Sequence, residues 1–148
     1  MEKIIILHNI RSQHNVGSIF RTADASGVSK IYLTGYTPAP IDRFGRKVGT
    51  ITKVSLGAEE FVPWEKKEDI SEVLDNLDAE IVAMEQDSRS INYKKYKPTG
   101  SVAYIFGDEV RGIPKKVLSR SDFILEIPMR GQKESLNVSV TAGIILFN

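Results

Sequence analysis

The segment from Ile127 to Phe147, IPMRGQKESLNVSVTAGIILF, fits two different secondary structures. Between Leu136 and Gly143 apolar residues alternate with polar ones, as they do in a half-buried strand. The same residues fit a helix with Ser135 as its N-cap. Such a helix would carry one apolar face made of Leu136, Val140, Ile144 and Phe147. The rest of the chain has to decide between the two.

The remaining sequence indicates an α/β fold. Strand-like apolar runs cover 3–7, 30–35, 79–85, 101–106 and 122–129, and a further short strand is expected within 59–64. Between them lie a helix with Asn15 as a possible N-cap and Gly27 as its end, a helix within 68–78, and one that begins at Pro114. Residues 36–57 are expected to form loops. Alternating strands and helices are typical of a mostly parallel sheet flanked by helices, so we interpret the last segment as a helix.

Composition narrows the class of protein. The 148 residues suit a single domain, 1–148, and a net charge of +1 means that any RNA binding must come from local basic clusters. The chain has no cysteine and only two histidines, and no metal-ligand spacing is present, so no metal is expected. Its apolar N-terminal run is too short for a signal peptide or a membrane span. We therefore expect a cytoplasmic protein without a membrane partner.

Three polar loops that carry glycine follow the predicted strands that end near Leu7, Phe106 and Met129. Ligands of parallel sheets bind beyond the carboxyl ends of the strands. The chain has no G-x-G-x-x-G motif and no G-x-S-x-G motif. The run GDEVRG has the glycine spacing of a P-loop, but Ile113 and Pro114 replace its Lys and Ser/Thr. Known phosphate-cradling loops are therefore not expected.

These loops resemble the three motifs of the SpoU/TrmH branch of the SPOUT superfamily, the RNA ribose 2′-O-methyltransferases. The run HNVGSIFRTADASG is similar to motif one in its Asn15, Gly17 and Arg21. The run YIFGDEVRGIP is similar to motif two in its Gly107, Glu109 and Gly112. The run IPMRGQKESLNVSVTAG is similar to motif three in its Pro128, Gly131, Ser135, Leu136 and Asn137. Three motifs in the right order are a far more specific signal than one.

The resemblance implies a SPOUT-type fold with a C-terminal trefoil knot and S-adenosylmethionine as methyl donor. The cofactor contacts that it implies are Met84, Glu85, Gly107, Gly112, Ile127, Met129, Ser135 and Leu136. Gly107 and Gly131 would let the backbone approach the ligand closely. Asp108 occupies a variable position of motif two, and we assign it no role.

The resemblance also implies a reaction, methylation of a ribose 2′-hydroxyl in RNA, and the catalytic residues. These are Arg21, Asn15, Glu109, Ser135 and Asn137. A guanidinium stays protonated, so a stabilising role for Arg21 is safer than that of a base, although both stay open. Asn15 and Ser135 could also be simple helix caps, and Glu109 could favour the helix that begins at Pro114.

Transfer RNA is the expected substrate, with ribosomal RNA as an alternative. A catalytically silent RNA-binding or assembly protein of the same fold is the other alternative. RNA contacts are expected from Arg11, His14, Arg43, Arg46, Lys47 and Lys53. The apolar end of the chain, VTAGIILF, predicts a homodimer, and a charged residue at Ile145 should yield monomers if that side chain faces the partner. Whether Arg21 acts within its own subunit or across the dimer is left open.

Overall fold

A computed structural model describes all residues from Met1 to Asn148 and contains one seven-stranded sheet. Its strands are β1 (Lys3–His8), β2 (Lys30–Thr34), β3 (Trp64–Lys67), β4 (Glu80–Met84), β5 (Ile91–Asn92), β6 (Val102–Phe106) and β7 (Phe123–Glu126). Every neighbouring pair is parallel, and the strand order is β3-β2-β1-β6-β4-β7-β5. The predicted parallel α/β sheet is confirmed.

Five α-helices connect and cover these strands. They are α1 (Gln13–Ala25), α2 (Gly49–Ser55), α3 (Ile70–Leu74), α4 (Lys115–Leu118) and α5 (Val138–Leu146), with short 3-10 turns at Ala58–Glu60 and Tyr93–Lys95. None of them is long and apolar enough to cross a lipid bilayer. The last segment is a helix, as its α/β context predicted.

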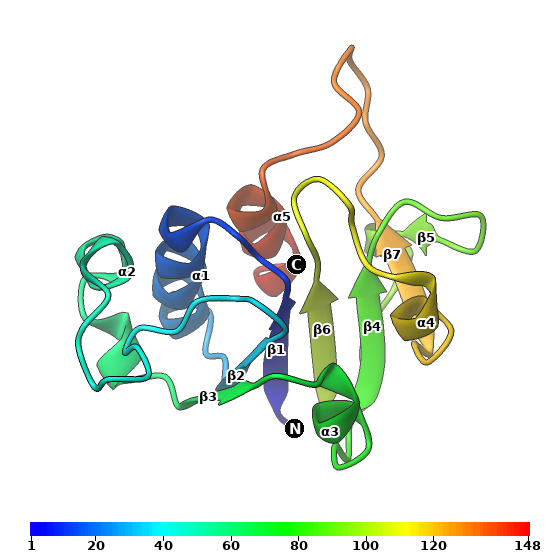
Figure 1. Ribbon diagram of the computed structural model, residues 1–148. Coiled ribbons are helices and arrows are strands. Elements are labelled where there is room, and N and C mark those ends of the chain that lie inside the picture. The colour runs from blue at the N-terminus through cyan, green and yellow to red at the C-terminus, as the bar shows by residue number, and fades with distance from the viewer.

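The sheet separates two hydrophobic layers. In β1, Ile5 and Leu7 belong to a core shared with α1, α2 and α5, whereas Ile4 and Ile6 face a second core shared with α3 and α4. This alternation is the period-two pattern of a strand whose two faces are both buried. Figure 1 shows α1 and α5 side by side, with α3 and α4 on other parts of the sheet. The carboxyl ends of β1, β4, β6 and β7 are thereby left free to support loops.

Two predicted helix caps are wrong. Ser12 caps α1, because its side chain accepts a hydrogen bond from the Asn15 amide. Asn137 caps α5, because its side-chain oxygen accepts from the Ser139 amide at 2.9 Å, and Ser135 lies outside the helix. Both shifts free the side chains of Asn15 and Ser135 for other contacts.

The helix α2 was not expected, since the segment 36–57 was predicted to be loops. Its β-branched residues disfavour a helix, and its N-terminus has no side-chain cap, so local sequence gives little signal. Tertiary packing stabilises it: Ile51 is fully buried in the core. A Cβ on Gly17 of α1 would lie 2.7 Å from the Ile51 carbonyl oxygen, so this motif-one glycine allows α1 and α2 to approach closely.

The C-terminal connection leads from β7 back to α1. Residues 127–137 leave the end of β7 as a projecting loop and return to α5, which packs beside α1 (Figure 1). Ala142, Ile145 and Leu146 of α5 are buried in the core that α1 also joins, so the condition that Ile145 faces a partner subunit is not met. The trefoil knot expected here stays a prediction.

Candidate functional site

A cavity of about 650 Å³ opens at the carboxyl edge of the sheet. Its walls come from the loops after β4, β6 and β7 and from the first residues of α1 and α5. The lining residues include apolar side chains near the sheet, namely Met84, Phe106, Leu125, Ile127, Leu136 and Val138. The cavity therefore lies where ligands of parallel sheets bind.

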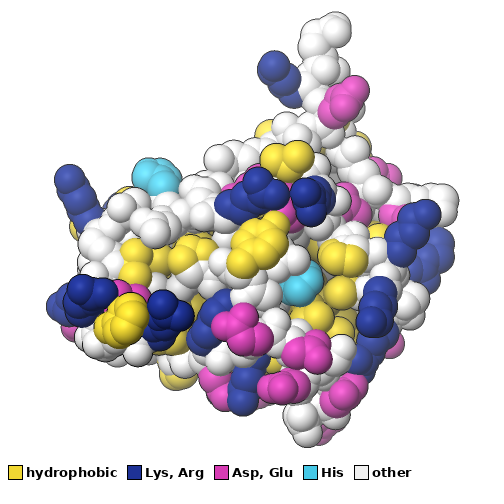
Figure 2. Space-filling view, in the orientation of Figure 1, with side chains coloured by type: hydrophobic (Ala, Val, Ile, Leu, Met, Phe, Trp, Pro, Cys, Tyr) yellow, Lys and Arg dark blue, Asp and Glu magenta, His cyan; other side chains and the backbone are white.

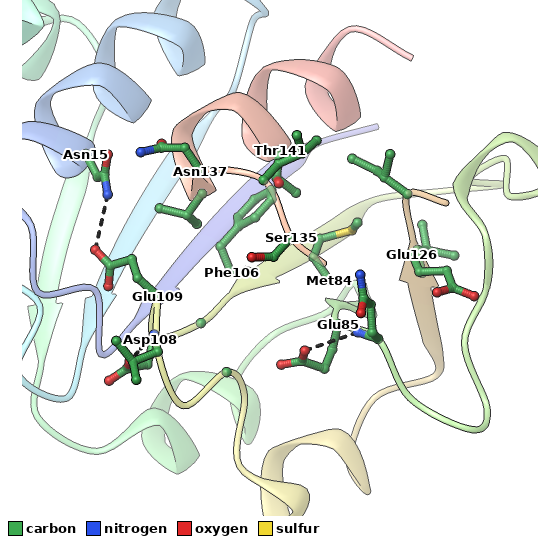
Figure 3. Close-up of a pocket in the computed structure, with 18 of the residues that line it drawn as sticks. Asn15, Met84, Glu85, Phe106, Asp108, Glu109, Glu126, Ser135, Asn137 and Thr141 are labelled. Carbon is green, nitrogen blue, oxygen red and sulfur yellow. Dashed lines mark hydrogen bonds between the residues drawn. The ribbon is translucent and has the colours of Figure 1, made fainter. Parts of the chain in front are cut away.

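The cavity brings together most of the predicted site residues. All eight predicted cofactor residues line it, and so do four of the five predicted catalytic residues, Asn15, Glu109, Ser135 and Asn137. Figure 3 shows the side chains of Asn15, Glu109 and Asn137 gathered on one side, with Ser135 lying towards Met84. Arg21 is the exception, because it does not line this cavity.

Glu109 ties motif two to motif one. Its carboxylate accepts hydrogen bonds from the Arg11 amide at 3.1 Å, the Ser12 amide at 3.2 Å and the Asn15 side-chain nitrogen at 3.2 Å. Burial raises the pKa of Glu109, but these hydrogen bonds outweigh burial and lower it below its ordinary value. Glu109 thus stabilises the N-terminus of α1, and not the helix that begins near Pro114.

Asp108 has a role that the sequence did not predict. This buried carboxylate accepts hydrogen bonds from the Tyr36 hydroxyl and from the Val110 and Arg111 amides, and it lies 3.6 Å from the Arg11 guanidinium. Burial raises the pKa of Asp108, yet these donors and the Arg11 charge lower it to about 2. Asp108 therefore fixes the loop that forms one wall of the cavity.

An Asp108→Asn variant is expected to be less stable at neutral pH by on the order of 2 kcal/mol, since the shift from 3.8 to about 2 is worth that much. Because folding lowers the pKa of Asp108, its ionised carboxylate stabilises the fold above about pH 4. This contribution to the free energy of unfolding is lost as the pH falls towards 2. Urea unfolding at several pH values measures this difference. If the difference in unfolding free energy between Asp108→Asn and the wild type does not shrink in acid, the role given to Asp108 is contradicted.

Glu85 and Gln86 brace the loop after β4. The Glu85 carboxylate accepts from the Ile113 amide at 2.7 Å, which ties β4 to the loop after β6. A Cβ on Gly112, whose φ is +71°, would lie 2.2 Å from the same carboxylate. The Gln86 side chain donates to the Glu134 carbonyl at 2.7 Å and so holds the projecting loop 127–137. These contacts fix the geometry of three cavity walls.

The two glycines expected to lie against the ligand differ. A Cβ on Gly107 would lie 2.5 Å from Ile113 and 3.0 Å from Gly112, so this glycine permits the turn itself to close. Gly131 has open space around it and does not line the cavity, and its close approach to a ligand stays a prediction.

Arg21 lies in a separate groove between α1, α2 and the C-terminal end of the chain. His14 and Ser18 of α1, Val54 of α2 and Phe147 line this groove with it. Arg21 and Asn15 are six residues apart, which corresponds to about 9 Å along the helix axis and to different faces of it. Arg21 therefore does not reach the cavity of its own subunit.

The predicted RNA contacts fall into three places. His14 joins Arg21 in the groove, and Arg11 lies beside Tyr36 at the cavity rim, with its guanidinium 5.8 Å from the ring centre. The other four, Arg43, Arg46, Lys47 and Lys53, are exposed between β2 and the end of α2. The Arg11 guanidinium contacts the Tyr36 hydroxyl and the Asp108 carboxylate, whereas Arg46 pairs with Asp42.

The charge of the cavity excludes some ligand classes. No Lys or Arg lines it, whereas Glu85, Asp108, Glu109 and Glu126 do. At the start of α1, Glu109 and Ser12 accept hydrogen bonds from backbone amides, and at the start of α5 the Asn137 side chain accepts one from the Ser139 amide. A phosphate group would be unpaired here, and a neutral or cationic ligand is favoured. No group of three or more His, Cys, Asp or Glu side chains is arranged to hold a metal ion.

Sequence reasoning missed several lining residues. Ser12, Gln86, Asp108 and Thr141 belong to the cavity, as do the apolar Phe106 and Leu125. The two apolar residues lie at or near the ends of predicted strands, a signal that was available. Asp108 and Gln86 are recognisable only from their tertiary hydrogen bonds.

Comparisons with known proteins bear on this arrangement. The 23S rRNA (guanosine-2'-O-)-methyltransferase RlmB of Coxiella burnetii is 33% identical over 147 residues, which cover 97% of this chain and 56% of that protein. The crystal structure of an AdoMet-bound rRNA methyltransferase from Sinorhizobium meliloti matches with a TM-score of 0.87 at 28% identity, over 99% of this chain and 54% of that one. The A. aeolicus TrmH/SpoU tRNA modifying enzyme matches with a TM-score of 0.84 at 28% identity, over 99% of this chain and 72% of that one.

This chain thus spans little more than half the length of the curated relatives that it matches. Within that span the likeness is continuous, and a model of the SpoU rRNA Methylase family matches residues 2–147. The three motif loops meet at one cavity in a fold shared with solved members of the family. The resemblance that these loops indicated is confirmed, and the chain belongs to the SpoU rRNA Methylase family.

Proposed function

We propose that residues 1–148 form a methyltransferase domain that transfers a methyl group from S-adenosylmethionine to a ribose 2′-hydroxyl of RNA. The observation that carries this proposal is the meeting of all three motif loops at one cavity that is lined by apolar and acidic side chains and by no Lys or Arg. Membership of the SpoU rRNA Methylase family supports it. The S. meliloti relative, whose structure contains AdoMet, has the same fold.

The cavity fits S-adenosylmethionine in size and charge. Its volume of about 650 Å³ lies in the range of small-molecule sites. Met84, Phe106 and Leu136 offer apolar surface for an adenine ring, while polar groups of Ser135 and Asn137 lie at the same opening. The ligand carries a positive sulfonium and no phosphate, which agrees with a lining that has carboxylates and no cation. When bound, the sulfonium supplies an already activated methyl group.

The residues of the chain then have to hold the hydroxyl that accepts the methyl group. Glu109 keeps Asn15 at the cavity rim through the 3.2 Å hydrogen bond, so the Asn15 amide is positioned and its oxygen is available to a substrate. The Ser135 hydroxyl and the Asn137 amide group lie around the same opening (Figure 3). These neutral groups orient a hydroxyl and can donate hydrogen bonds to its oxygen, but none of them carries a positive charge to offset the negative charge that develops there.

Arg21 is the residue that we propose for that role, acting across a homodimer. It lies outside its own cavity, in the groove beside Phe147. On α5, Val140, Ile144 and Phe147 form an apolar stripe at i, i+4 and i+7, with Val140 49% and Phe147 64% exposed. A second copy packed on this stripe and on α1 would bring its Arg21 towards the cavity. Its guanidinium could then hold a phosphate and stabilise the oxygen.

We propose transfer RNA as the substrate. The A. aeolicus relative is a tRNA modifying enzyme, whereas the C. burnetii and S. meliloti relatives are rRNA methyltransferases. The test incubates the protein with S-adenosylmethionine labelled in its methyl group and with either bulk tRNA or ribosomal RNA from cells that lack the gene. Label in tRNA alone supports the proposal. Label in ribosomal RNA alone would identify ribosomal RNA as the substrate instead. Label in neither RNA would contradict the proposed activity.

Cofactor binding is expected at one S-adenosylhomocysteine per chain. A Gly107→Val change should weaken it by on the order of tenfold or more, because the new side chain collides with Ile113 and displaces a cavity wall. Gly131→Val is the matched control: the surroundings of Gly131 are open, so its affinity should stay near that of the wild type. Titration calorimetry measures both. No binding by the wild-type protein at millimolar ligand would contradict the cofactor assignment.

A further inference from the structure

The connection between β2 and α2 exposes an aromatic ring among cations. Phe44 is 65% exposed, and the guanidinium carbons of Arg43 and Arg46 lie 4.9 Å and 5.0 Å from its ring centre. A single exposed apolar side chain is ordinary. Two guanidinium groups on one exposed ring are a more specific feature, because they place planar, positively charged groups beside an aromatic face at the surface.

The turn that carries Phe44 is well defined. Asp42 accepts hydrogen bonds on its side chain from the Phe44 amide at 2.9 Å and the Arg46 amide at 3.0 Å. The backbone pairs Asp42 with Arg46 at 2.8 Å, and Ile41 forms an antiparallel bridge with Lys47. The backbone hydrogen bonds of Phe44 and its neighbours lie within the turn. The ring therefore has a fixed position, and a ligand that binds to it does not have to order a flexible loop.

The charge around this turn is strongly positive. Arg43, Arg46, Lys47 and Lys53 are exposed, and only Arg46 has an acidic partner, Asp42 at 3.4 Å. Figure 2 shows basic side chains on either side of a hydrophobic group at this edge of the molecule, over the loop before α2. Since the whole chain has a net charge of only +1, this edge is a local concentration of positive charge.

We infer that the Phe44 turn, residues Asp42–Arg46, is a stacking site for an unpaired base of the RNA substrate. A nucleobase stacks on aromatic rings and on guanidinium planes alike, and both are present here. Lys47 and Lys53 neutralise the neighbouring phosphates. The partner is therefore RNA with a single-stranded or splayed-out base, because a regular duplex offers no exposed base face. This inference rests on the proposed function only for the choice of RNA as partner.

The chain itself supplies a matched control. Phe61 is even more exposed, at 74%, but it follows the acidic Glu59 and Glu60 and has no cation on its ring. If exposure alone determined RNA binding, Phe61 would matter as much as Phe44. If stacking within a cationic surface determines it, only Phe44 matters.

The experiment measures binding of fluorescein-labelled oligoadenylate of 12 nucleotides, and of a duplex of the same length, to full-length protein by anisotropy. Phe44→Leu should weaken binding of the single strand by about tenfold, the usual loss of one stacked base, and should change duplex binding much less. Phe44→Trp should retain the affinity, and Phe61→Leu should match the wild type. The slope of affinity against salt should stay unchanged in Phe44→Leu, but fall by about 0.7 for each lost phosphate contact in Lys47→Gln or Lys53→Gln.

The inference is overturned if Phe44→Leu binds the single strand within twofold of the wild type, or if Phe61→Leu weakens binding equally. A lower mass of Phe44→Leu in light scattering would also overturn it, since the ring would then serve a protein interface. Its failure is distinguishable from failure of the proposed function. Wild-type protein that binds S-adenosylhomocysteine and methylates RNA, with Phe44→Leu fully active and tightly binding, refutes the stacking site alone.

Discussion

Replacing Arg21 by alanine is expected to reduce methyl transfer to RNA by on the order of 100-fold or more, while S-adenosylhomocysteine binds as in the wild type. The loss corresponds to removal of one oriented donor that stabilises developing charge. Cofactor affinity should persist because Arg21 lies outside the cavity, in the groove with His14 and Phe147. Single-turnover methylation and calorimetry on the same variant separate the two effects.

Arg21→Lys should restore little activity, since a point charge does not reproduce a planar guanidinium. A mixture of Arg21→Ala with Gly107→Val subunits provides the sharper control. If Arg21 acts across the dimer, mixed dimers contain one intact site, and equal mixing should recover about a quarter of the wild-type activity. An Arg21→Ala variant with wild-type activity, or a mixture with none, would refute this role of Arg21.

A charge placed in the apolar stripe of α5 is expected to have the second large effect, loss of both the dimer and most of the methylation activity. Val140→Lys should give monomers, because the lysine would be buried without a partner if a second copy covers this face. The monomers should methylate RNA at least 100-fold more slowly than the wild type, because each cavity then lacks the Arg21 that completes it. Val140 is half exposed in the single chain, so the fold itself should survive.

Phe61→Lys is the matched control for the dimer, since Phe61 is a large exposed apolar side chain on a different surface. It should keep the dimer mass in light scattering and the activity. Monomeric Val140→Lys with normal methylation would show that dimerisation is incidental. A wild-type protein that is monomeric at micromolar concentration would refute the dimer altogether.

Much of the fold could be predicted from the order of apolar and polar residues along the chain. The strands β1, β4 and β6 are apolar runs that a sheet buried on both faces requires, and their predicted positions are confirmed to within one or two residues. The last helix could be assigned only because the rest of the chain alternates between strands and helices. Its own alternation from Leu136 to Gly143 fits a strand equally well.

Features that depend on tertiary contacts could not be predicted. The helix α2 forms because Ile51 is buried against α1, where Gly17 leaves room for it. Tyr96 lies among lysines in the sequence, yet it is buried in the core and its hydroxyl contacts Glu80. Burial first, and then that hydrogen bond, raises the pKa of Tyr96 well above its ordinary value.

The candidate site also combines features that the sequence predicts with features that depend on the tertiary structure. Residues of all three motifs line one cavity, because loops that follow the carboxyl ends of parallel strands lie at the same edge of the sheet. The position of Arg21 follows instead from the rotation of α1, which turns it away from Asn15. The sequence left open whether Arg21 acts within one subunit, and its place beside Phe147 favours action across a dimer.

The proposed activity is tested most directly by locating the transferred methyl group. RNA methylated by the protein with S-adenosylmethionine is digested completely to nucleosides, which are identified by mass spectrometry. The proposal predicts a 2′-O-methylnucleoside that is present with wild-type protein and absent with Arg21→Ala. A methyl group on a base, or no methylated nucleoside with tRNA or ribosomal RNA from cells lacking the gene, would contradict it.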